Sequence, residues 1–128
     1  MRIKDCELRE VISCDKSDNI VSVAKKLKQE KERHIIVTEK NKPVGIISTT
    51  DVNNRVVAEN KNPQKTTANE IMTSPIMTQD IDEQLAKAYF EMLKSNVFSC
   101  PVTQKGKLVG ALDLKTAMNH LIKNKFKK

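Results

Sequence analysis

Two stretches of the sequence, 65 residues apart, decide the fold: Gly45 to Asp51 reads "GIISTTD", and Gly110 to Thr116 reads "GALDLKT". The segments around them also align without a gap when the chain is shifted by 65 positions, so that residues 11–27 match 76–92 and residues 35–51 match 100–116. Self-similarity at a fixed period indicates a duplicated structural unit. The 128-residue chain therefore predicts two copies of one small unit.

Each copy predicts an α/β unit with the order strand, helix, strand, strand, helix. Apolar residues of the first helix recur at helical spacing in both copies: Ile20, Val23, Ala24 and Leu27 match Leu85, Ala88, Tyr89 and Met92. A hairpin follows over residues 35–47 and 100–112, and a second helix begins near Thr49 and Leu114. We expect a first repeat over 1–60, a polar linker with Pro63 over 61–70, a second repeat over 71–124 and a basic tail over 125–128.

Composition narrows the classes of function. The formal net charge is +7, but four of the last six residues are lysines, and 7 − 4 leaves only +3 for the rest. Aromatic residues are scarce, which disfavours binding of bases by stacking. Cys6, Cys14 and Cys100 form no C-x-x-C pair, and the sequence shows no apolar leader or membrane span. We therefore expect a cytoplasmic protein that does not associate with a membrane.

The turn at Gly45 to Asp51 admits a structural and a functional interpretation. Ser48 and Asp51 fit a capping box at the start of the second helix. The same helix start offers amide groups and the hydroxyls of Ser48, Thr49 and Thr50 to a phosphate. Asp51 would then accept hydrogen bonds from both hydroxyls of a ribose, or would only form a surface ion pair with Arg55.

The second copy changes both decisive positions, because Asp113 matches Ser48 and Thr116 matches Asp51. Asp113 is a good helix cap by itself. Its carboxylate would repel a phosphate by about 4 kcal/mol at close range, unless Lys115 or another cation offsets the charge. The sequence therefore favours binding at one site.

The gapless duplication, with "GIISTTD" closing the first hairpin and "IMTSPIMTQDID" (Ile71 to Asp82) opening the second copy, resembles the CBS domain pair, also called the Bateman module. The resemblance implies two repeats packed sheet to sheet with pseudo-twofold symmetry. It also implies clefts for adenosine compounds: AMP, ADP, ATP, S-adenosylmethionine or methylthioadenosine. It implies no cofactor and no metal.

By this resemblance Ser48, Thr49, Thr50 and Asp51 bind phosphate and ribose, while the base is flanked by Ile76, Met77, Phe98, Ser99, Cys100 and Pro101. A second cleft would combine Asp113 and Thr116 with the stretches Val11–Ile12 and Arg33–Ile35. There His34 would pair with Asp113, or be a structural residue, and Arg33 would contact a phosphate. The segment "FSCP", Phe98 to Pro101, lacks the arginine or histidine that often precedes its proline, so S-adenosylmethionine and methylthioadenosine stand beside AMP and ATP as candidate ligands.

These observations predict a stand-alone regulatory module that binds one adenosyl ligand, forms a homodimer and modulates an unidentified partner protein. Enzyme activity is not expected, since no phosphate-binding loop, metal-spaced cluster or Ser/Cys-His pair is present. Two alternatives remain. One is a ligand-free oligomerisation scaffold, and the other is a nucleic-acid-binding protein that uses the lysine tail and Lys25, Lys26 and Lys28.

Overall fold

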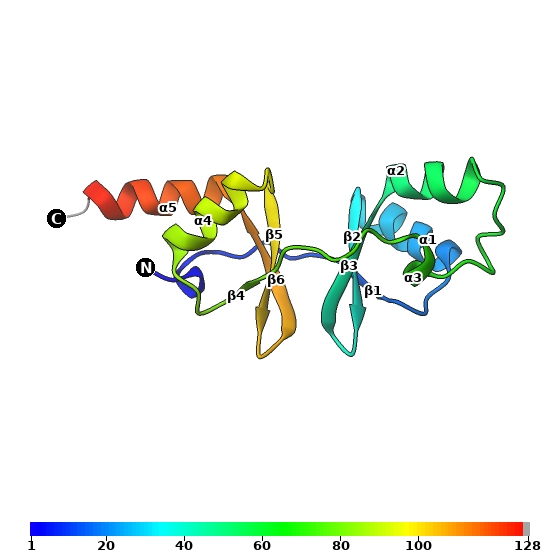
Figure 1. The fold of residues 1–128 in the computed structure, drawn as a ribbon, viewed down its shortest axis with the longest axis horizontal. Helices are drawn as coiled ribbons and strands as arrows, with labels where there is room; N and C mark the ends of the chain where they lie inside the picture. Colours follow the sequence, from blue (N-terminus) through cyan, green and yellow to red (C-terminus); the bar gives the residue numbers. More distant parts are fainter. Residues whose placement is uncertain (127–128) are drawn as a thin grey trace. The chain divides into compact units, whose positions relative to one another are not determined.

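A computed structural model describes residues 1–126, which belong to two compact units (Figure 1). The first unit is Val11–Ile76 and contains the first sequence repeat. The second unit joins Met1–Glu10 to Met77–Lys128 and contains the second repeat. Both units hold a three-stranded sheet, which confirms the predicted α/β repeats.

The first unit has its strands in the order β1-β2-β3, with β1 at Ser13–Asp15, β2 at His34–Glu39 and β3 at Lys42–Ser48. Strands β1 and β2 are parallel and are connected through helix α1, Ile20–Glu30. Strands β2 and β3 form an antiparallel hairpin. Helix α2, Thr49–Val52, continues into the π-helical segment η2, Asn53–Val57, and α3 follows at Ala68–Ile71.

The second unit repeats this order with β4 at Gln79–Asp80, α4 at Leu85–Lys94, β5 at Ser99–Gln104 and β6 at Lys107–Asp113. It also contains the 3-10 turn η1, Ile3–Asp5, and ends in α5, Leu114–Phe126. Part of the expected basic tail is thus helical, and Lys127 and Lys128 lie outside the described residues.

Both hairpins use a two-residue loop, Lys40-Asn41 in one and Lys105-Gly106 in the other. All four residues have positive φ, between 51° and 80°. Positive φ at both central positions is typical of the turn whose twist matches that of an antiparallel pair. The loops therefore fix the same strand register in both units.

The core of each unit lies between its sheet and its first long helix. Helix α1 buries Ile20, Val23 and Leu27, and α4 buries Leu85, Ala88 and Met92. The strands add equivalent side chains at Ile35, Val37, Ile47 and at Cys100, Val102, Leu112. Ala24 was expected on the buried face but is exposed, and Tyr89 is half-buried, because both residues lie at the edge of the apolar stripe.

The compact units do not coincide with the expected boundaries at residues 60 and 70. In the first unit, the segment before the second repeat pairs Thr67 with Asn19 and Thr73 with Ile46. In the second unit, the segment at the start of the chain pairs Arg2 with Gln84 and Arg9 with Ala111. Each segment carries apolar residues that need a core, and Ile3 and Ile71 are buried there. Each repeat is therefore completed by the segment that precedes the other repeat.

Gly45 and Gly110 lie where these segments cross the hairpins. A Cβ on Gly45 would overlap the side chain of Met72 and lie 3.0 Å from the Thr73 carbonyl oxygen. A Cβ on Gly110 would lie 3.0 Å from Leu8 Cβ and 3.2 Å from the Arg9 carbonyl oxygen. Glycine at both positions is thus explained by close approach of the backbone.

Candidate functional site

The turn at the end of β3 forms a complete capping box. Ser48 Oγ accepts a hydrogen bond from the Asp51 amide at 3.0 Å, and Asp51 Oδ2 accepts one from the Ser48 amide at 2.9 Å. Ser48 has extended backbone angles and is the N-cap of α2. The structural interpretation of the Ser-x-x-Asp motif is therefore realised, and a ligand role has to coexist with it.

The first turn of α2 leaves part of its hydrogen-bonding capacity available. The Thr49 amide donates to the Arg33 carbonyl at 2.9 Å, and the Asp51 amide donates to Ser48 Oγ. The Thr50 amide has no backbone partner among residues 1–126. The side chains of Thr49 and Thr50 are exposed. One amide and two hydroxyls can thus meet a polar ligand without loss of a cap.

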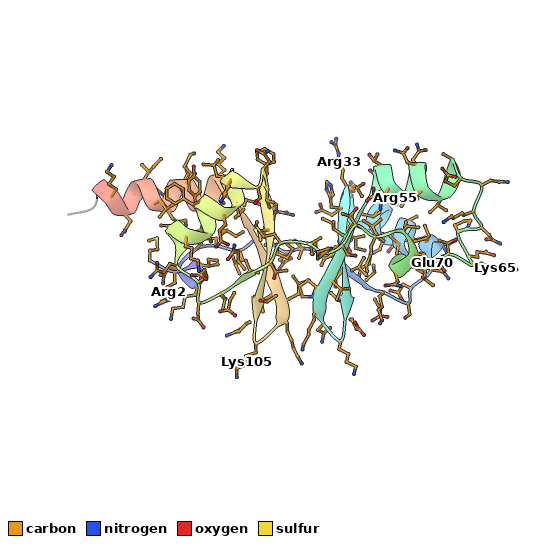
Figure 2. All side chains as sticks on the ribbon, viewed as in Figure 1. Arg2, Arg33, Arg55, Lys65, Glu70 and Lys105 are labelled. Carbon is orange, nitrogen blue, oxygen red and sulfur yellow. The ribbon has the colours of Figure 1, made fainter. Side chains whose placement is uncertain are left out.

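The Asp51 carboxylate is oriented by groups of its own unit. Its side chain is 19% exposed, and Oδ1 lies 3.7 Å from Arg55 Nε. Arg55 also donates through Nη1 to the Ile71 carbonyl at 2.7 Å, which ties α2 and η2 to α3. Figure 2 shows Arg55 on this unit and Arg33 projecting from its β2 end. The expected pair between Asp51 and Arg55 is present at a long distance, and Oδ1 has capacity for further donors.

The corresponding place in the second unit is occupied by a protein cation. Arg9 Nε lies 3.2 Å from Asp113 Oδ1 and 3.3 Å from Oδ2, and Arg9 Nη2 donates to Ser99 Oγ at 2.7 Å. The carboxylate of Asp113 is therefore paired with Arg9 within its own unit. His34 belongs to the first unit and is exposed. The cation that offsets the Asp113 charge is Arg9.

Sequence reasoning missed Arg9, because residues 1–10 were assigned to the first repeat. The bridges pair Arg9 with Ala111 and Thr73 with Ile46, so Thr73 takes the equivalent place in the first unit. Threonine supplies no charge there. In the sequence, Arg9 and Asp113 are only two residues of opposite charge that lie more than a hundred positions apart.

The residues expected around a base differ in accessibility. Cys100 and Pro101 are buried, and burial together with nearby Glu91 raises the pKa of the Cys100 thiol to about 12. Only the backbone of these two residues can therefore face a ligand. Met77 is half-buried against the second core, Ile76 is half-buried in the first unit, and Phe98 is 72% exposed. Ser99 is exposed and bonded to Arg9.

The residues expected in a second cleft fall on both units. Ile12 and Ile35 contribute to the first core, and Ile35 is fully buried. Val11 is half-buried. Arg33, which precedes β2, and His34, its first residue, are exposed. Asp113 and Thr116 lie at the start of α5 in the second unit, half-buried. Lys26, one of the lysines considered for nucleic acid, donates to the Ser13 carbonyl at 2.5 Å.

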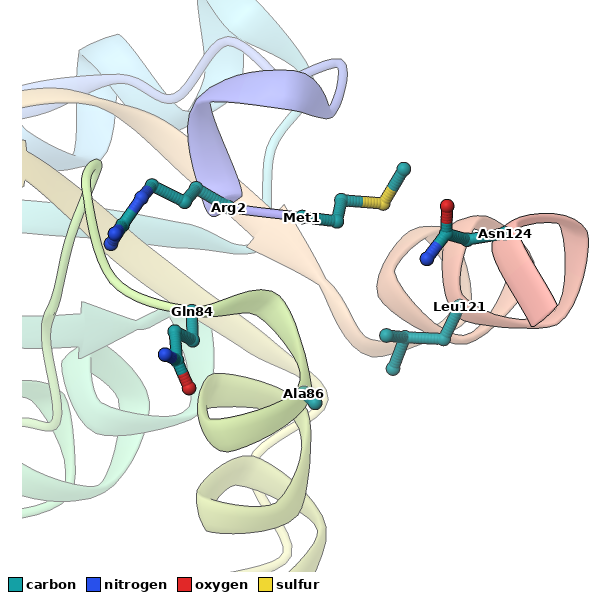
Figure 3. A pocket seen from close by; sticks show the side chains of 6 residues that line it. All are labelled: Met1, Arg2, Gln84, Ala86, Leu121 and Asn124. Atoms are coloured by element: carbon teal, nitrogen blue, oxygen red, sulfur yellow. The ribbon is translucent and has the colours of Figure 1, made fainter.

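Hollows occur within single units of the described chain, among them the following. A cavity of about 270 Å³ is lined by apolar side chains of α4 and α5 together with Phe98, Asp113 and Lys115. A second of about 240 Å³ lies between α1 and α2 and includes Ala24, Leu27 and Val52. A third of about 260 Å³ lies beside Met1, Arg2 and Gln84 (Figure 3). The guanidinium of Arg2 donates to the Asp82 carbonyl, so this third hollow offers little free positive charge.

Within residues 1–126, no group of three or more metal-ligating side chains comes together. No described helix is both long enough and apolar enough to cross a membrane.

Comparison with protein families matches the CBS domain twice, over residues 3–58 and 68–123. An uncharacterized protein of Methanopyrus kandleri is 31% identical over 108 residues, which are 83% of this chain and 55% of the relative. The CBS domain-containing protein CBSCBSPB1 of Arabidopsis thaliana is 30% identical over 81% of this chain and 19% of its own length. The chain thus spans about half of the first relative and a fifth of the second.

Solved structures with this fold include two complexes. The CBS domain pair of protein MJ0100, in complex with 5'-methylthioadenosine and S-adenosyl-L-methionine, is 27% identical with a TM-score of 0.68, and the match covers 95% of this chain and 99% of that one. The CBS domain protein PAE2072 of Pyrobaculum aerophilum, complexed with AMP, is 25% identical with a TM-score of 0.70, over 91% and 89%. A signal-transduction protein of Burkholderia ambifaria, 19% identical with a TM-score of 0.68 over 98% and 95%, shares the fold.

Proposed function

The chain belongs to the CBS domain family, and from this membership we propose that it is a regulatory module that binds one adenosine derivative per chain. CBS-pair neighbours bind AMP, S-adenosylmethionine or methylthioadenosine, which supports an adenosyl ligand. The single observation that carries the proposal is the intact Ser48-x-x-Asp51 turn, which keeps the Thr50 amide and Asp51 Oδ1 available. The second repeat has Asp113 and Thr116 at those positions.

In this proposal Ser48, Thr49 and Thr50 contact phosphate or a polar ribose substituent, and Asp51 accepts from the ribose hydroxyls. Charge-assisted hydrogen bonds of this kind contribute roughly 1.5–3 kcal/mol each. Ile76, Met77 and the Phe98–Pro101 segment supply the surface for the base. AMP, ATP, S-adenosylmethionine and methylthioadenosine remain the ligands to be compared.

Regulation would operate by linkage: a ligand that binds one conformation more tightly shifts the population toward it, and a partner that prefers that conformation then binds more tightly. CBS-domain proteins are typically regulatory, which supports a module without catalysis of its own. Three free cysteines, two of them buried, support the proposed location in a reducing cytoplasm.

We further propose that the module forms a homodimer through an apolar surface on the second unit, made of Phe90, Leu93, Phe98 and Met118. These side chains are 66%, 47%, 72% and 37% exposed. The matched residues of the first repeat are Lys25, Lys28, Arg33 and Asn53, so the repeat fold does not require apolar residues there. A twofold contact of the surface with itself buries no charge, whereas contact with the matched face would bury three cations.

Isothermal titration with AMP, ATP, S-adenosylmethionine and methylthioadenosine tests the proposed function. We expect micromolar binding of one of these compounds at one per chain, and its loss in Asp51→Ala. The matched control is Thr116→Ala, which changes the equivalent position of the second repeat and should leave binding intact. Because Asp51 also caps α2, circular dichroism must show that Asp51→Ala is folded. Absence of binding, or binding that survives Asp51→Ala in a folded protein, would overturn the assignment.

A further inference from the structure

Arg9 links three segments that are far apart in the sequence: residues 1–10, the start of β5 and the end of β6. Its backbone pairs with Ala111, which directs its side chain along the edge strand. Its guanidinium then reaches both Asp113 and Ser99. The register of the hairpin places Ser99 directly opposite Asp113, so one arginine spans a cross-strand pair.

The equivalent place in the first unit has no arginine from the incoming segment. The register there sets His34 opposite Ser48, and Thr73 replaces Arg9. Among residues 1–126, the side-chain hydrogen bonds at Ser48 are those of the capping box with Asp51. The two repeats thus differ in the ion pair at this turn, which is Asp51–Arg55 in the first and Arg9–Asp113 in the second.

From this contrast we propose that Arg9 and Asp113 form a latch that closes the second repeat to anionic adenosine ligands and limits the protein to one ligand per chain. The latch rests on the proposed function, because it concerns the same class of ligand. The paired charges cancel, so the place offers a phosphate no net attraction, and Asp113 holds the guanidinium that could otherwise bind one. The side chains of Arg9 and Asp113 are 44% and 35% exposed, so a ligand could reach the Arg9 guanidinium if the carboxylate were absent.

The latch makes a gain-of-function test available. Asp113→Ser combined with Thr116→Asp recreates the Ser-x-x-Asp turn in the second repeat and frees Arg9. Titration with AMP should give one ligand per wild-type chain and two per chain in the paired variant. Adding Arg9→Ala should weaken the new AMP site at least tenfold and leave methylthioadenosine, which has no phosphate, almost unaffected. If the paired variant fails to fold, Asp113→Asn replaces it in the test. This substitution keeps the shape of the side chain and should also gain AMP affinity.

The outcomes separate this inference from the proposed function. Two AMP molecules on the wild-type chain would overturn both the latch and the proposed stoichiometry of one per chain, while adenosyl binding itself would stand. A single AMP on a folded paired variant would overturn the latch alone. No binding to wild type with one AMP on the paired variant would overturn the proposed function and support the latch. If Arg9→Ala alone weakens the wild-type AMP site but not methylthioadenosine binding, Arg9 serves the first ligand and the latch is wrong.

Discussion

Ser48 and Asp51 exchange hydrogen bonds across the start of α2, so both side chains stabilise the start of the helix. Loss of an N-cap side chain typically costs about 1 kcal/mol. We therefore expect Ser48→Ala to lower the free energy of unfolding by about 1 kcal/mol in urea denaturation. Thr50→Ala is the control and should stay within about 0.5 kcal/mol, because Thr50 is exposed. Equal effects of the two substitutions would contradict the capping role.

Cys100 links a single residue to the pH dependence of stability. Burial raises the pKa of its thiol to about 12, whereas a thiol in an unfolded chain ionises near pH 8.5. The raised pKa gives stability that is complete below about pH 8.5 and is lost as the pH rises toward 12. Between pH 8 and pH 10 the free energy of unfolding should fall by about 2 kcal/mol more in wild type than in Cys100→Ala. Parallel pH profiles from urea titrations would contradict this.

At the scale of elements, the two glycines test the close crossing of each hairpin by the incoming segment. A methyl group on Gly45 would overlap Met72 and press on the Thr73 carbonyl, and overpacking of this kind costs about 1–3 kcal/mol. Gly45→Ala should therefore destabilise the protein by that amount in chemical denaturation. Gly45→Ala combined with Met72→Ala should recover part of the loss. No recovery would show that the backbone contact, rather than the Met72 side chain, sets the cost.

Elements were predictable where local patterns dominate. The 65-residue repeat located both hairpins and the long helices α1 and α4, because apolar spacing reports the buried face directly. The repeat also matches Gly45 with Gly110, but the close contacts with Met72 and Leu8 that require glycine there depend on segments distant in sequence. Helix α3 was missed, since a four-residue helix stabilised by packing of Ile71 has little periodic signal.

The apolar surface belongs to α4, α5 and the loop before β5, and its exposed side chains predict self-association. Phe90→Lys gives the second repeat the residue that the first repeat has at the matched position, Lys25. We expect this variant to dissociate at concentrations where the wild type is dimeric, measured by analytical ultracentrifugation. The control is Lys25→Phe, which should leave the dimer intact. A monomeric wild type, or an unchanged Phe90→Lys dimer, would contradict the proposed contact.

At the scale of the whole molecule, the division of the chain into units depends on contacts that no local pattern announces. Residues 1–10 precede the first repeat but bond to the second, through Ile3 to Glu83, Lys4 to Ile81 and Arg9 to Ala111. Sequence order alone assigns a segment to the repeat that follows it. Arg9 was missing from the expected site for the same reason, and the pairing of Asp113 could not be found without it.

This exchange of segments makes a prediction about local stability. Ile3 is fully buried in the second core, and Ile71 is buried in the first. Truncation of a buried isoleucine to alanine costs about 2–5 kcal/mol. Ile3→Ala should therefore reduce hydrogen-exchange protection most in α4, β5, β6 and α5, although Ile3 precedes the first repeat. Ile71→Ala, the matched variant, should reduce it most in α1, β2 and β3. Loss of protection in residues 11–76 on Ile3→Ala would mean that residues 1–10 stabilise the repeat that follows them in sequence. The division of the chain into these two units would then not hold in solution.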